Sequence, residues 1–344
     1  QLSKYRSLSV FGHTPSFAVD GRSMDLSNLR TQSGADYLVA GNVRKSATGV
    51  RIAARLTDAQ TGMTIWADHF DWPEDVGQAS QDEVANGISS TLFNRVQSET
   101  AKRGISIGPT GLTSHELTLQ GIWHFKKMTR PACKIAASCF KEAIKLNPDN
   151  AEAYRGLAMC ENNRWFFDFE SEGLERGVAY AERSIELDPT SAVCHAAMGC
   201  CRLFLDGADQ AEKSYVRALR LNPGDPHILA EMALLNAYQG RMDTSRELAA
   251  HVLLLDPLPP VWYAEFAGVA DFVEGQYEKC FAAFSAVPEG AWDVMYALSC
   301  LGLIGDAKRS RQLREKLKAA GRDWDFVAAA RREPFTDAEP RARL

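Results

Sequence analysis

Cysteine and histidine are the side chains in this sequence with the chemistry to bind a transition metal or to form disulfides. The seven histidines are scattered, and no H-E-x-x-H pattern occurs. No two cysteines have the C-x-x-C spacing of zinc sites and redox centres. Most cysteines fall among Ala, Leu and Met in helical patterns, which predicts small buried thiols in a reducing compartment rather than disulfides or metal ligands. The eight cysteines are Cys133, Cys139, Cys160, Cys194, Cys200, Cys201, Cys280 and Cys300.

Acidic pairs can act as general acid and base, and glycine-rich loops can hold phosphate, but the sequence supports neither chemistry. The pairs Glu74/Asp75 and Asp82/Glu83 fall at the start of an expected helix, where carboxylates complement the helix dipole. No phosphate-binding loop and no G-x-S-x-G nucleophile motif occurs. His124 stands beside a tryptophan and is expected to pack rather than to bind a ligand. We therefore predict no catalytic residue, no metal, no cofactor and no enzyme activity of this chain's own.

Composition and charge narrow the class of protein further. A chain of 344 residues with 45% hydrophobic and 24% charged residues has the size and composition of two folded domains. Residues 1–108 hold 11 basic and 11 acidic residues, so the net charge of −5 belongs to the remainder, and neither part is basic enough to predict nucleic-acid binding. The apolar stretches are interrupted well short of a bilayer span, so no membrane insertion is expected. Because the chain begins at Gln1 rather than at methionine, we expect a further segment to precede it in the full-length protein.

An Asn or Asp followed by proline closes four apolar segments. These are "EAIKLNPDN", "RSIELDPTS", "RALRLNPGD" and "HVLLLDPLP". Their prolines and Pro288 are separated by 41, 34, 34 and 31 residues. Proline cannot continue a helix and disfavours helical geometry in the residue before it, so each segment is expected to end the second helix of a pair. A period of 34 residues is that of the tetratricopeptide repeat.

Small and aromatic residues recur at matched distances from these prolines. Two helices that pack closely need small residues where their backbones approach and a ring to fill the next gap. The residues 12, 8 and 5 positions before Pro148 and Pro223 are Ala136, Phe140 and Ala143, and Ala211, Tyr215 and Ala218. The residues ten positions after Pro148, Pro189, Pro223 and Pro257 are Ala158, Gly199, Ala233 and Ala267. The step of 41 residues accommodates an insertion at residues 162–173. A last pair at about residues 291–320 ends without proline, and its charged second helix is expected to be a solvated cap.

The first hundred residues follow a different period. "VRIAARLTD" alternates apolar and polar residues as a strand with one wet face does, and "ADYLVAGNVR" and "MTIWADHFD" join it through short turns, which predicts three antiparallel strands. We expect a further strand at residues 6–12 and a short helix at 23–34. From about Gln78, a helix carrying Val84, Ile88, Leu92 and Val96 on one stripe is expected to pack on the sheet.

The run "GADYLVAGNVRKSATGVRIAARLTDAQTGMTIWADHFD" followed by "QDEVANGIS" resembles the small α/β domain related to the N-terminal domain of TolB and to FlgO. That domain commonly precedes tetratricopeptide repeats in bacterial proteins, and "HELTLQGIWHFKKMTR", "LLLDPLPPVWY" and "RREPFTD" resemble the same proteins. The resemblance implies an α+β chain with a truncated TolB-N/FlgO-like domain at residues 1–107. Residues 108–344 would form an all-α tetratricopeptide-repeat superhelix of five to six helix pairs with a C-terminal cap. In the family, the front end is a class III adenylate or guanylate cyclase domain or a winged-helix DNA-binding domain, as in CadC-, ToxR- or HilA-like activators.

Stacked helix pairs wind into a superhelix with an inner groove lined by the first helix of each pair, and such grooves hold peptides. Only Arg155 and Asn162 among the expected groove residues could hold a terminal carboxylate, so an apolar or helical partner segment is favoured. The alternative is that these side chains only pack between repeats. The groove positions that we select are Phe125, Arg155, Met159, Asn162, Cys200, Leu203, His227 and Leu234.

The aromatic run at residues 164–169 is a second candidate, because Trp165, Phe166 and Phe167 lie in the insertion and could form an exposed contact patch. Burial of these rings is the favoured alternative.

Together these features predict a regulatory or sensory region of a bacterial signalling protein, non-catalytic and binding a protein or peptide. The partner could be another domain of the same protein or a second copy, with a homodimer left open. The alternative is an effector-binding region that senses a small molecule and controls an upstream DNA-binding domain. The cysteines favour the cytoplasm, and the periplasmic face stays open if the full-length protein crosses the membrane.

Overall fold

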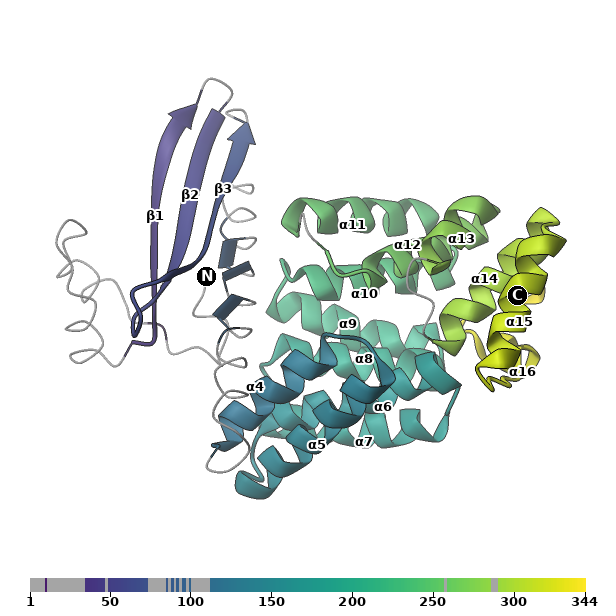
Figure 1. Cartoon of the computed structure of the whole chain (residues 1–344), viewed down its shortest axis with the longest axis horizontal. Coiled ribbons are helices and arrows are strands. Elements are labelled where there is room, and N and C mark those ends of the chain that lie inside the picture. Colours follow the sequence, from purple (N-terminus) through teal and green to yellow (C-terminus); the bar gives the residue numbers. More distant parts are fainter. Residues whose placement is uncertain are drawn as a thin grey trace. The chain divides into compact units, whose positions relative to one another are not determined.

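The computed structural model describes residue 10, residues 35–46, 49–73, 112–256, 259–285 and 290–344, and eight helical positions between 85 and 99. The chain divides into two compact units, Gln1–Thr100 and Ala101–Leu344 (Figure 1). The predicted domain boundary at residue 107 falls among residues outside the described ranges and stays a prediction.

The described part of the first unit contains a three-stranded antiparallel sheet in the order β1-β2-β3. The central strand carries the predicted alternation, because Arg51 and Arg55 are exposed while Ala54 and Leu56 are buried. Arg51 also forms an exposed two-pronged ion pair with Asp71 on the neighbouring strand. The prediction of three antiparallel strands is thus confirmed. The strands are β1 (Tyr37–Ser46), β2 (Gly49–Asp58) and β3 (Thr64–Pro73).

Helical residues after the sheet cover its apolar face. Leu92 is buried with Leu56 and Trp66, and Ile88 and Val96 pack against the same cluster. Spacing of four residues places these three side chains on one side of a helix, as predicted. Val84, the strand expected at residues 6–12 and the helix expected at 23–34 lie outside the described residues.

The second unit is helical throughout the part that the structure describes. Twelve helices form six consecutive pairs that stack side by side (Figure 1). Two short helices, α16 and α17, follow the last pair. The pairs are α4 (Ser114–Phe125) with α5 (Arg130–Leu146), α6 (Ala151–Asp168) with α7 (Glu172–Leu187), α8 (Ala192–Asp206) with α9 (Ala208–Leu221), α10 (Pro226–Tyr238) with α11 (Met242–Leu255), α12 (Trp262–Val273) with α13 (Tyr277–Ser285), and α14 (Ala291–Ile304) with α15 (Ala307–Ala319); α16 is Phe326–Arg332 and α17 is Ala338–Arg343.

Proline ends the second helix of the early pairs, as predicted. Helices α5, α7 and α9 each finish at a leucine and are capped by Asn147, Asp188 and Asn222, whose φ values of −141°, −139° and −143° leave the helical range. Each cap still donates its N–H to the carbonyl four residues earlier. Proline follows each of these caps and cannot donate a further bond, so the chain turns there.

Rings on the second helices fill spaces left by small residues on the first helices. The Phe140 ring lies so close to Gly121 and Gly156 that an added Cβ would come within 2.5 Å and 2.4 Å of it. In the same way, a Cβ added at Gly199 would lie 2.8 Å from the Tyr215 ring. Both rings are 1% exposed. The predicted pairing of small residue and ring therefore holds the helix pairs together.

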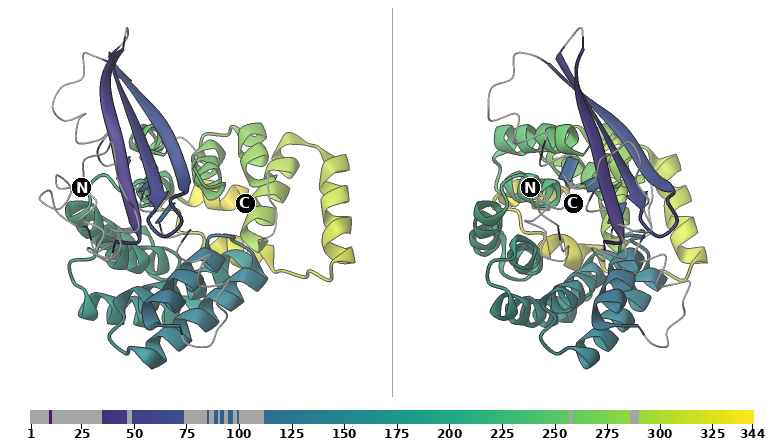
Figure 2. Two further views of the ribbon diagram at one scale, coloured as in Figure 1. Left: turned by 60° about the vertical axis from the view of Figure 1, so that its left-hand side comes forward. Right: turned by 90° about the vertical axis from the view of Figure 1, so that its left-hand side faces the viewer.

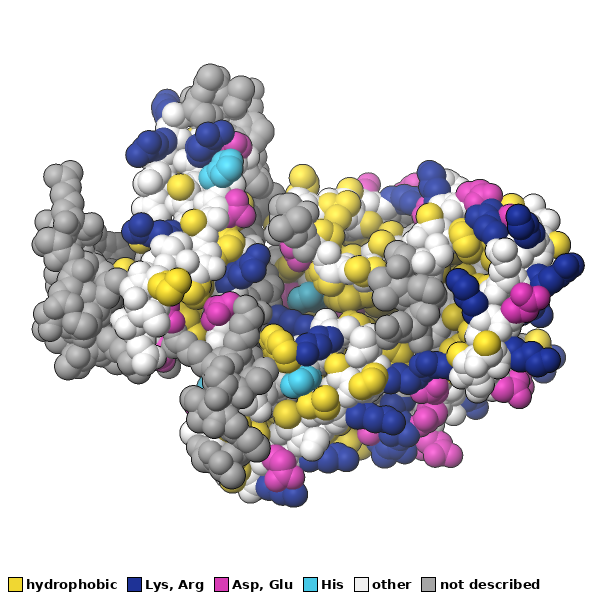
Figure 3. Space-filling view, in the orientation of Figure 1, with side chains coloured by type: hydrophobic (Ala, Val, Ile, Leu, Met, Phe, Trp, Pro, Cys, Tyr) yellow, Lys and Arg dark blue, Asp and Glu magenta, His cyan; other side chains and the backbone are white. Residues whose placement is uncertain are grey.

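In each pair the first helix buries a larger share of its residues than the second helix does. In α10 every residue except His227 and Met232 is buried, which is typical of a helix covered on both faces. Helix α15 has no buried residue, and Figure 3 shows its Lys and Arg side chains gathered at the surface, as expected of a solvated cap.

Candidate protein-interaction face

The first helices of the pairs contact one another in chain order from α4 to α12 and form one layer, which we call the first-helix layer. In addition, α14 contacts α6, four pairs away along the chain. The Phe166 and Trp292 rings meet edge to face with centroids 5.0 Å apart, and the backbone at Gly290 lies against the Phe166 carbonyl. The layer therefore curls until the sixth pair meets the second.

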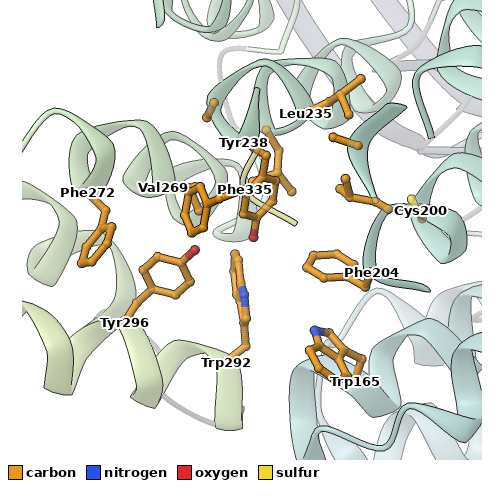
Figure 4. Close-up of a cluster of buried hydrophobic side chains, with 14 of the residues drawn as sticks. Trp165, Cys200, Phe204, Leu235, Tyr238, Val269, Phe272, Trp292, Tyr296 and Phe335 are labelled. Atoms are coloured by element: carbon orange, nitrogen blue, oxygen red, sulfur yellow. The ribbon is translucent and has the colours of Figure 1, made fainter. Parts of the chain in front are cut away.

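This curl turns the middle of the layer into a core of rings. Figure 4 shows Trp165, Phe204, Tyr238 and Trp292 converging from helices α6, α8, α10 and α14. The pair Phe204 and Tyr238 meets edge to face at 6.1 Å. An interior of this kind is closely packed and leaves little room for a ligand.

Four of the eight predicted groove residues are interior. Cys200, Leu203 and Leu234 are 7%, 1% and 2% exposed and belong to the ring-filled core. Asn162 is 3% exposed, and its Oδ1 has no hydrogen-bond partner. These four side chains pack between helices in the structure and present no free surface to a partner.

The other four predicted groove residues, Phe125, Arg155, Met159 and His227, are partly exposed. Met159 packs against two of the buried clusters from the side of α6. Arg155 forms an ion pair with Glu152 at 2.6 Å, with its side chain 18% exposed. Its buried Nε has no hydrogen-bond partner in the structure. The buried Nε is out of reach of a bound molecule, but the side chain as a whole is partly exposed, and a guanidinium is suited to donate a charge-assisted hydrogen bond to an oxygen of a bound molecule.

His227, on the first turn of α10, continues this surface. Its ring stacks on Trp262 with centroids 5.5 Å apart and planes 18° apart, and its Nδ1 lies 2.9 Å from the Tyr263 hydroxyl. Burial lowers the pKa of His227, with Asp225 opposing the change, so the imidazole is neutral near pH 7.

Charges on α4, α6 and α10 act on one another across the layer. Desolvation, and then the charge of Arg155, lower the pKa of Lys126 although its surface is exposed, while Glu152 opposes this. The pKa of Arg155 is raised although burial works against it, because Glu152 is adjacent. We call Lys126, Glu152, Arg155, Asp225 and His227 the Arg155 patch. Its cations and carboxylates nearly balance, so it suits a polar or amphipathic segment better than a strongly anionic one.

Sequence reasoning missed Lys126, Trp262 and Tyr263. Lys126 caps α4 just beyond the last position that the repeat spacing assigns to the groove. Trp262 and Tyr263 follow the "LLLDPLPP" segment, whose two extra prolines, Pro259 and Pro260, interrupt the repeat numbering. Extending the same spacing from Pro257 selects Val261, Ala264, Gly268 and Asp271 and misses both rings.

The aromatic run of the insertion lies mostly inside. Trp165 and Phe167 are 1% and 7% exposed, and Phe166 is partly buried against Phe204 and Trp292. Trp165 and Phe167 therefore do not form the exposed contact patch, because the insertion lengthens α6 and carries the rings into the core. Trp165 and Phe167 are buried, which is the alternative that the sequence favoured.

The cysteines and the acidic side chains form no other kind of site in the part of the chain that the structure describes. The eight cysteines are all free, and seven of them are buried. Over the described ranges, no group of three or more His, Cys, Asp or Glu side chains is arranged to hold a metal ion. Among the helices that the structure describes, none combines the length and apolar character needed to span a bilayer.

Stacked helix pairs ended by proline at a 34-residue spacing, with rings seated against small residues, define a superhelix of the tetratricopeptide type, which is a protein-interaction fold. The chain as a whole is α+β, with the three-stranded sheet preceding this superhelix.

The chain is similar in part to known proteins. No family model matches the chain. The chain is 23% identical over 214 residues to "Putative adenylate cyclase 3" of Rhizobium meliloti (strain 1021), a match that covers 61% of this chain and 36% of that protein. It is 29% identical over 110 residues to Hsp70-Hsp90 organizing protein 3 of Arabidopsis thaliana, covering 32% of this chain and 18% of that protein. The chain thus spans about a third or less of the length of these relatives.

Solved structures are similar in part. A thermophilic TPR protein of Thermus thermophilus matches with a TM-score of 0.42 and 20% identity, over 55% of this chain and 97% of that one. A human IFIT1 dimer with m7Gppp-AAAA matches with a TM-score of 0.49 and 13% identity, over 67% of this chain and 58% of that one.

Proposed function

We propose that this chain is a non-catalytic regulatory region of a bacterial signalling protein and that it binds a protein or peptide segment on the first-helix layer. The tetratricopeptide-type fold supports a binding role. Similarity over 61% of the chain to the protein named "Putative adenylate cyclase 3" supports a place in signalling.

The observation that carries this proposal is the Arg155 patch. The charged Arg155 side chain is partly exposed beside Glu152, and the layer also presents the partly exposed His227 and Trp262. A segment with an apolar face could lie on the rings while one of its oxygens accepts a bond from Arg155.

The proposal also covers the first unit, which we assign to a TolB-N/FlgO-like domain. Its three strands and the helical residues packed on them are compatible with a TolB-N/FlgO-like domain. In that arrangement, the output domain would be a nucleotide cyclase or a winged-helix DNA-binding domain. The cyclase relative favours the first of these, and reading the gene upstream of the codon for Gln1 would distinguish them.

A displayed peptide library selected against the folded chain tests the proposal. Peptides recovered from it are titrated against the wild-type chain and the Arg155→Ala variant by fluorescence anisotropy. Loss of the charge-assisted hydrogen bond should weaken binding by about tenfold or more. Arg183→Ala is the matched control, because Arg183 is a similarly paired arginine on the second helix α7.

The proposal is contradicted if selected peptides bind Arg155→Ala as tightly as wild type, or if both variants lose binding equally. If no peptide is recovered, peptide binding is contradicted, and thermal stabilisation by a small-molecule panel then tests the effector alternative.

A further inference from the structure

The C-terminal segment, residues 324–344, turns back after α15 and lies against the first-helix layer. In both views of Figure 2, the bright yellow C-terminal end lies within the row of helix pairs. The Phe326 ring meets Phe169 of the turn after α6 at 6.2 Å, and Phe335 packs on Tyr238 of α10 at 4.8 Å. The Thr336 N–H donates to the Tyr238 carbonyl at 2.9 Å.

Further bonds fix the end of the segment. The Ser299 hydroxyl on α14 donates to the Leu344 carbonyl at 2.7 Å. Arg343 donates to the Tyr277 hydroxyl at 2.8 Å and to the Val273 carbonyl at 2.9 Å. The segment therefore touches the end of α6, α10, α14 and the α12–α13 pair, which are widely separated along the chain.

Glu333 is the centre of this contact. Its Oε2 accepts from the Tyr238 hydroxyl at 2.6 Å and from the Tyr296 hydroxyl at 2.8 Å, and its Oε1 accepts from Trp292 Nε1 at 3.1 Å. The residue is 1% exposed. We call Tyr238, Trp292 and Tyr296 the Glu333 pocket.

The pocket has the features of a recognition site. Three donors from two helices converge on one carboxyl group, and the buried Pro334 and Phe335 follow it directly in the chain. Burying a carboxyl group costs free energy that an apolar side chain of the same size would avoid. The three donors of the pocket therefore select for a carboxyl group at this position rather than maximise the stability of the fold.

The segment is built to depend on this pocket. Helices α16 and α17 have only 7 and 6 residues, and helices this short are not stable without tertiary contacts. Apart from Glu333, Pro334 and Phe335, its buried residues are Ala329, Ala330 and Pro340, while Val327 is 63% exposed. Buried anchors therefore alternate with exposed residues along the segment.

We propose that the Glu333 pocket is a second recognition site, specific for a Glu-Pro-Phe segment, and that residues 324–344 occupy it as a displaceable intramolecular ligand. A partner that uses this part of the layer must present an equivalent acidic and aromatic segment and displace the chain's own. This site uses different residues from the Arg155 patch and stands independently of the proposed function.

A binding experiment in trans tests the displacement. A fluorescent synthetic peptide of residues 324–344 is titrated against the full chain and its Phe335→Ala variant. The variant weakens the intramolecular contact, so it should bind the peptide at least tenfold more tightly than wild type does. The same peptide with Glu333→Ala should bind the variant at least tenfold more weakly. Val327→Ala in the full chain is the matched control and should behave as wild type.

The proposal is overturned if the Phe335→Ala chain keeps its helical circular dichroism and does not bind the peptide. If that variant does not fold, hydrogen exchange of the wild-type chain decides. Amides of residues 326–343 should exchange together and faster than those of α10 and α14. Exchange at the same rate as those helices would show that the segment is an inseparable part of the core and would also overturn the proposal.

Discussion

Burial favours the neutral form of three glutamates on or against the first helices. It raises the pKa of Glu231 and of Glu265 to about 8, Asp293 adding to the effect at Glu265, and raises that of Glu333 to about 7, from an ordinary value of 4.5. Glu231 receives a hydrogen bond from Cys200, and Glu333 receives three from its pocket, yet desolvation outweighs these bonds. Each folded-state pKa lies above that of the unfolded chain, so stability falls as pH rises.

The substitution Glu333→Gln should remove part of this pH dependence. The contribution of Glu333 is fully present below pH 4.5 and is lost as pH rises through about 7. A shift of this size corresponds to on the order of 3 kcal/mol. Glutamine cannot ionise, so the free energy of unfolding of the variant should fall less between pH 5 and pH 8 than that of wild type. Urea denaturation at both pH values measures the difference.

Glu339→Gln is the control, because the Glu339 side chain is 74% exposed and forms an ion pair with Arg343 at the surface. It should show the wild-type pH dependence. An unchanged pH dependence in Glu333→Gln would mean that the carboxyl group is already ionised in the folded chain.

At the scale of the helix, two glycines provide a matched test of the packing between pairs. A Cβ at Gly199 would lie 2.8 Å from three atoms of the Tyr215 ring, whereas a Cβ at Gly302 in α14 would meet nothing within 4 Å. Gly199→Ala should destabilise the chain by about 1–3 kcal/mol because the ring must move. Gly302→Ala should stabilise it by up to about 1 kcal/mol because alanine favours the helix.

Thermal and urea unfolding of both variants measure the two changes. Equal effects of the same sign would show that helix propensity, and not the ring, decides the outcome at Gly199. Double substitution with Tyr215→Leu should recover part of the loss at Gly199, since the smaller side chain leaves room for the added methyl group.

The ends of the helices and the contacts between small residues and rings could be predicted from the sequence because they depend on residues close together in the chain. Proline after Asn147, Asp188 and Asn222 ends helices wherever it stands, and the small residue at Gly199 faces the ring that the spacing assigned to it. In the fifth pair, the close approach to Phe284 falls at Gly268, one residue after the predicted Ala267. The extra prolines before that pair shift the helix start, and a fixed spacing cannot follow such a shift.

The candidate site was less predictable because it depends on how the pairs curve. Repeat spacing identifies which side of α8 or α10 faces inward, but it does not show whether that side stays open. Cys200 and Leu234 face inward and are buried by the curl of the layer, whereas Arg155 and His227 face inward and stay partly exposed. Residues 324–344 pack back against the first-helix layer through contacts such as that between Tyr238 and Glu333, which are 95 residues apart in the sequence. No local sequence pattern predicts a contact of this kind.

At the scale of the second unit, the contact between α6 and α14 distinguishes this superhelix from an open array. In an open array each repeat touches only its neighbours, and the ends can unfold separately. Here Phe166 of the second pair reaches Trp292 of the sixth, and both rings belong to the core or pack against it. The stability of the last pairs is therefore coupled to that of the second pair.

Phe166→Ala tests this coupling. The Phe166 ring lies edge to face with Phe204 and with Trp292, each at 5.0 Å, and its loss opens a cavity between α6, α8 and α14. Removal of a packed phenylalanine costs about 3–5 kcal/mol, less where the site is partly exposed. Because the cavity touches both ends of the curl, hydrogen exchange should become faster in residues 291–304 as well as in 160–168.

Phe140→Ala is the matched control, since Phe140 packs in a separate cluster formed by the first two pairs. It should speed exchange in residues 114–160 and leave residues 291–304 unchanged, because no member of that cluster comes from α14 in the described residues. If Phe166→Ala also leaves residues 291–304 unchanged, the ring contact does not couple the sixth pair to the second, and the layer behaves as an open array whose ends meet without mutual stabilisation.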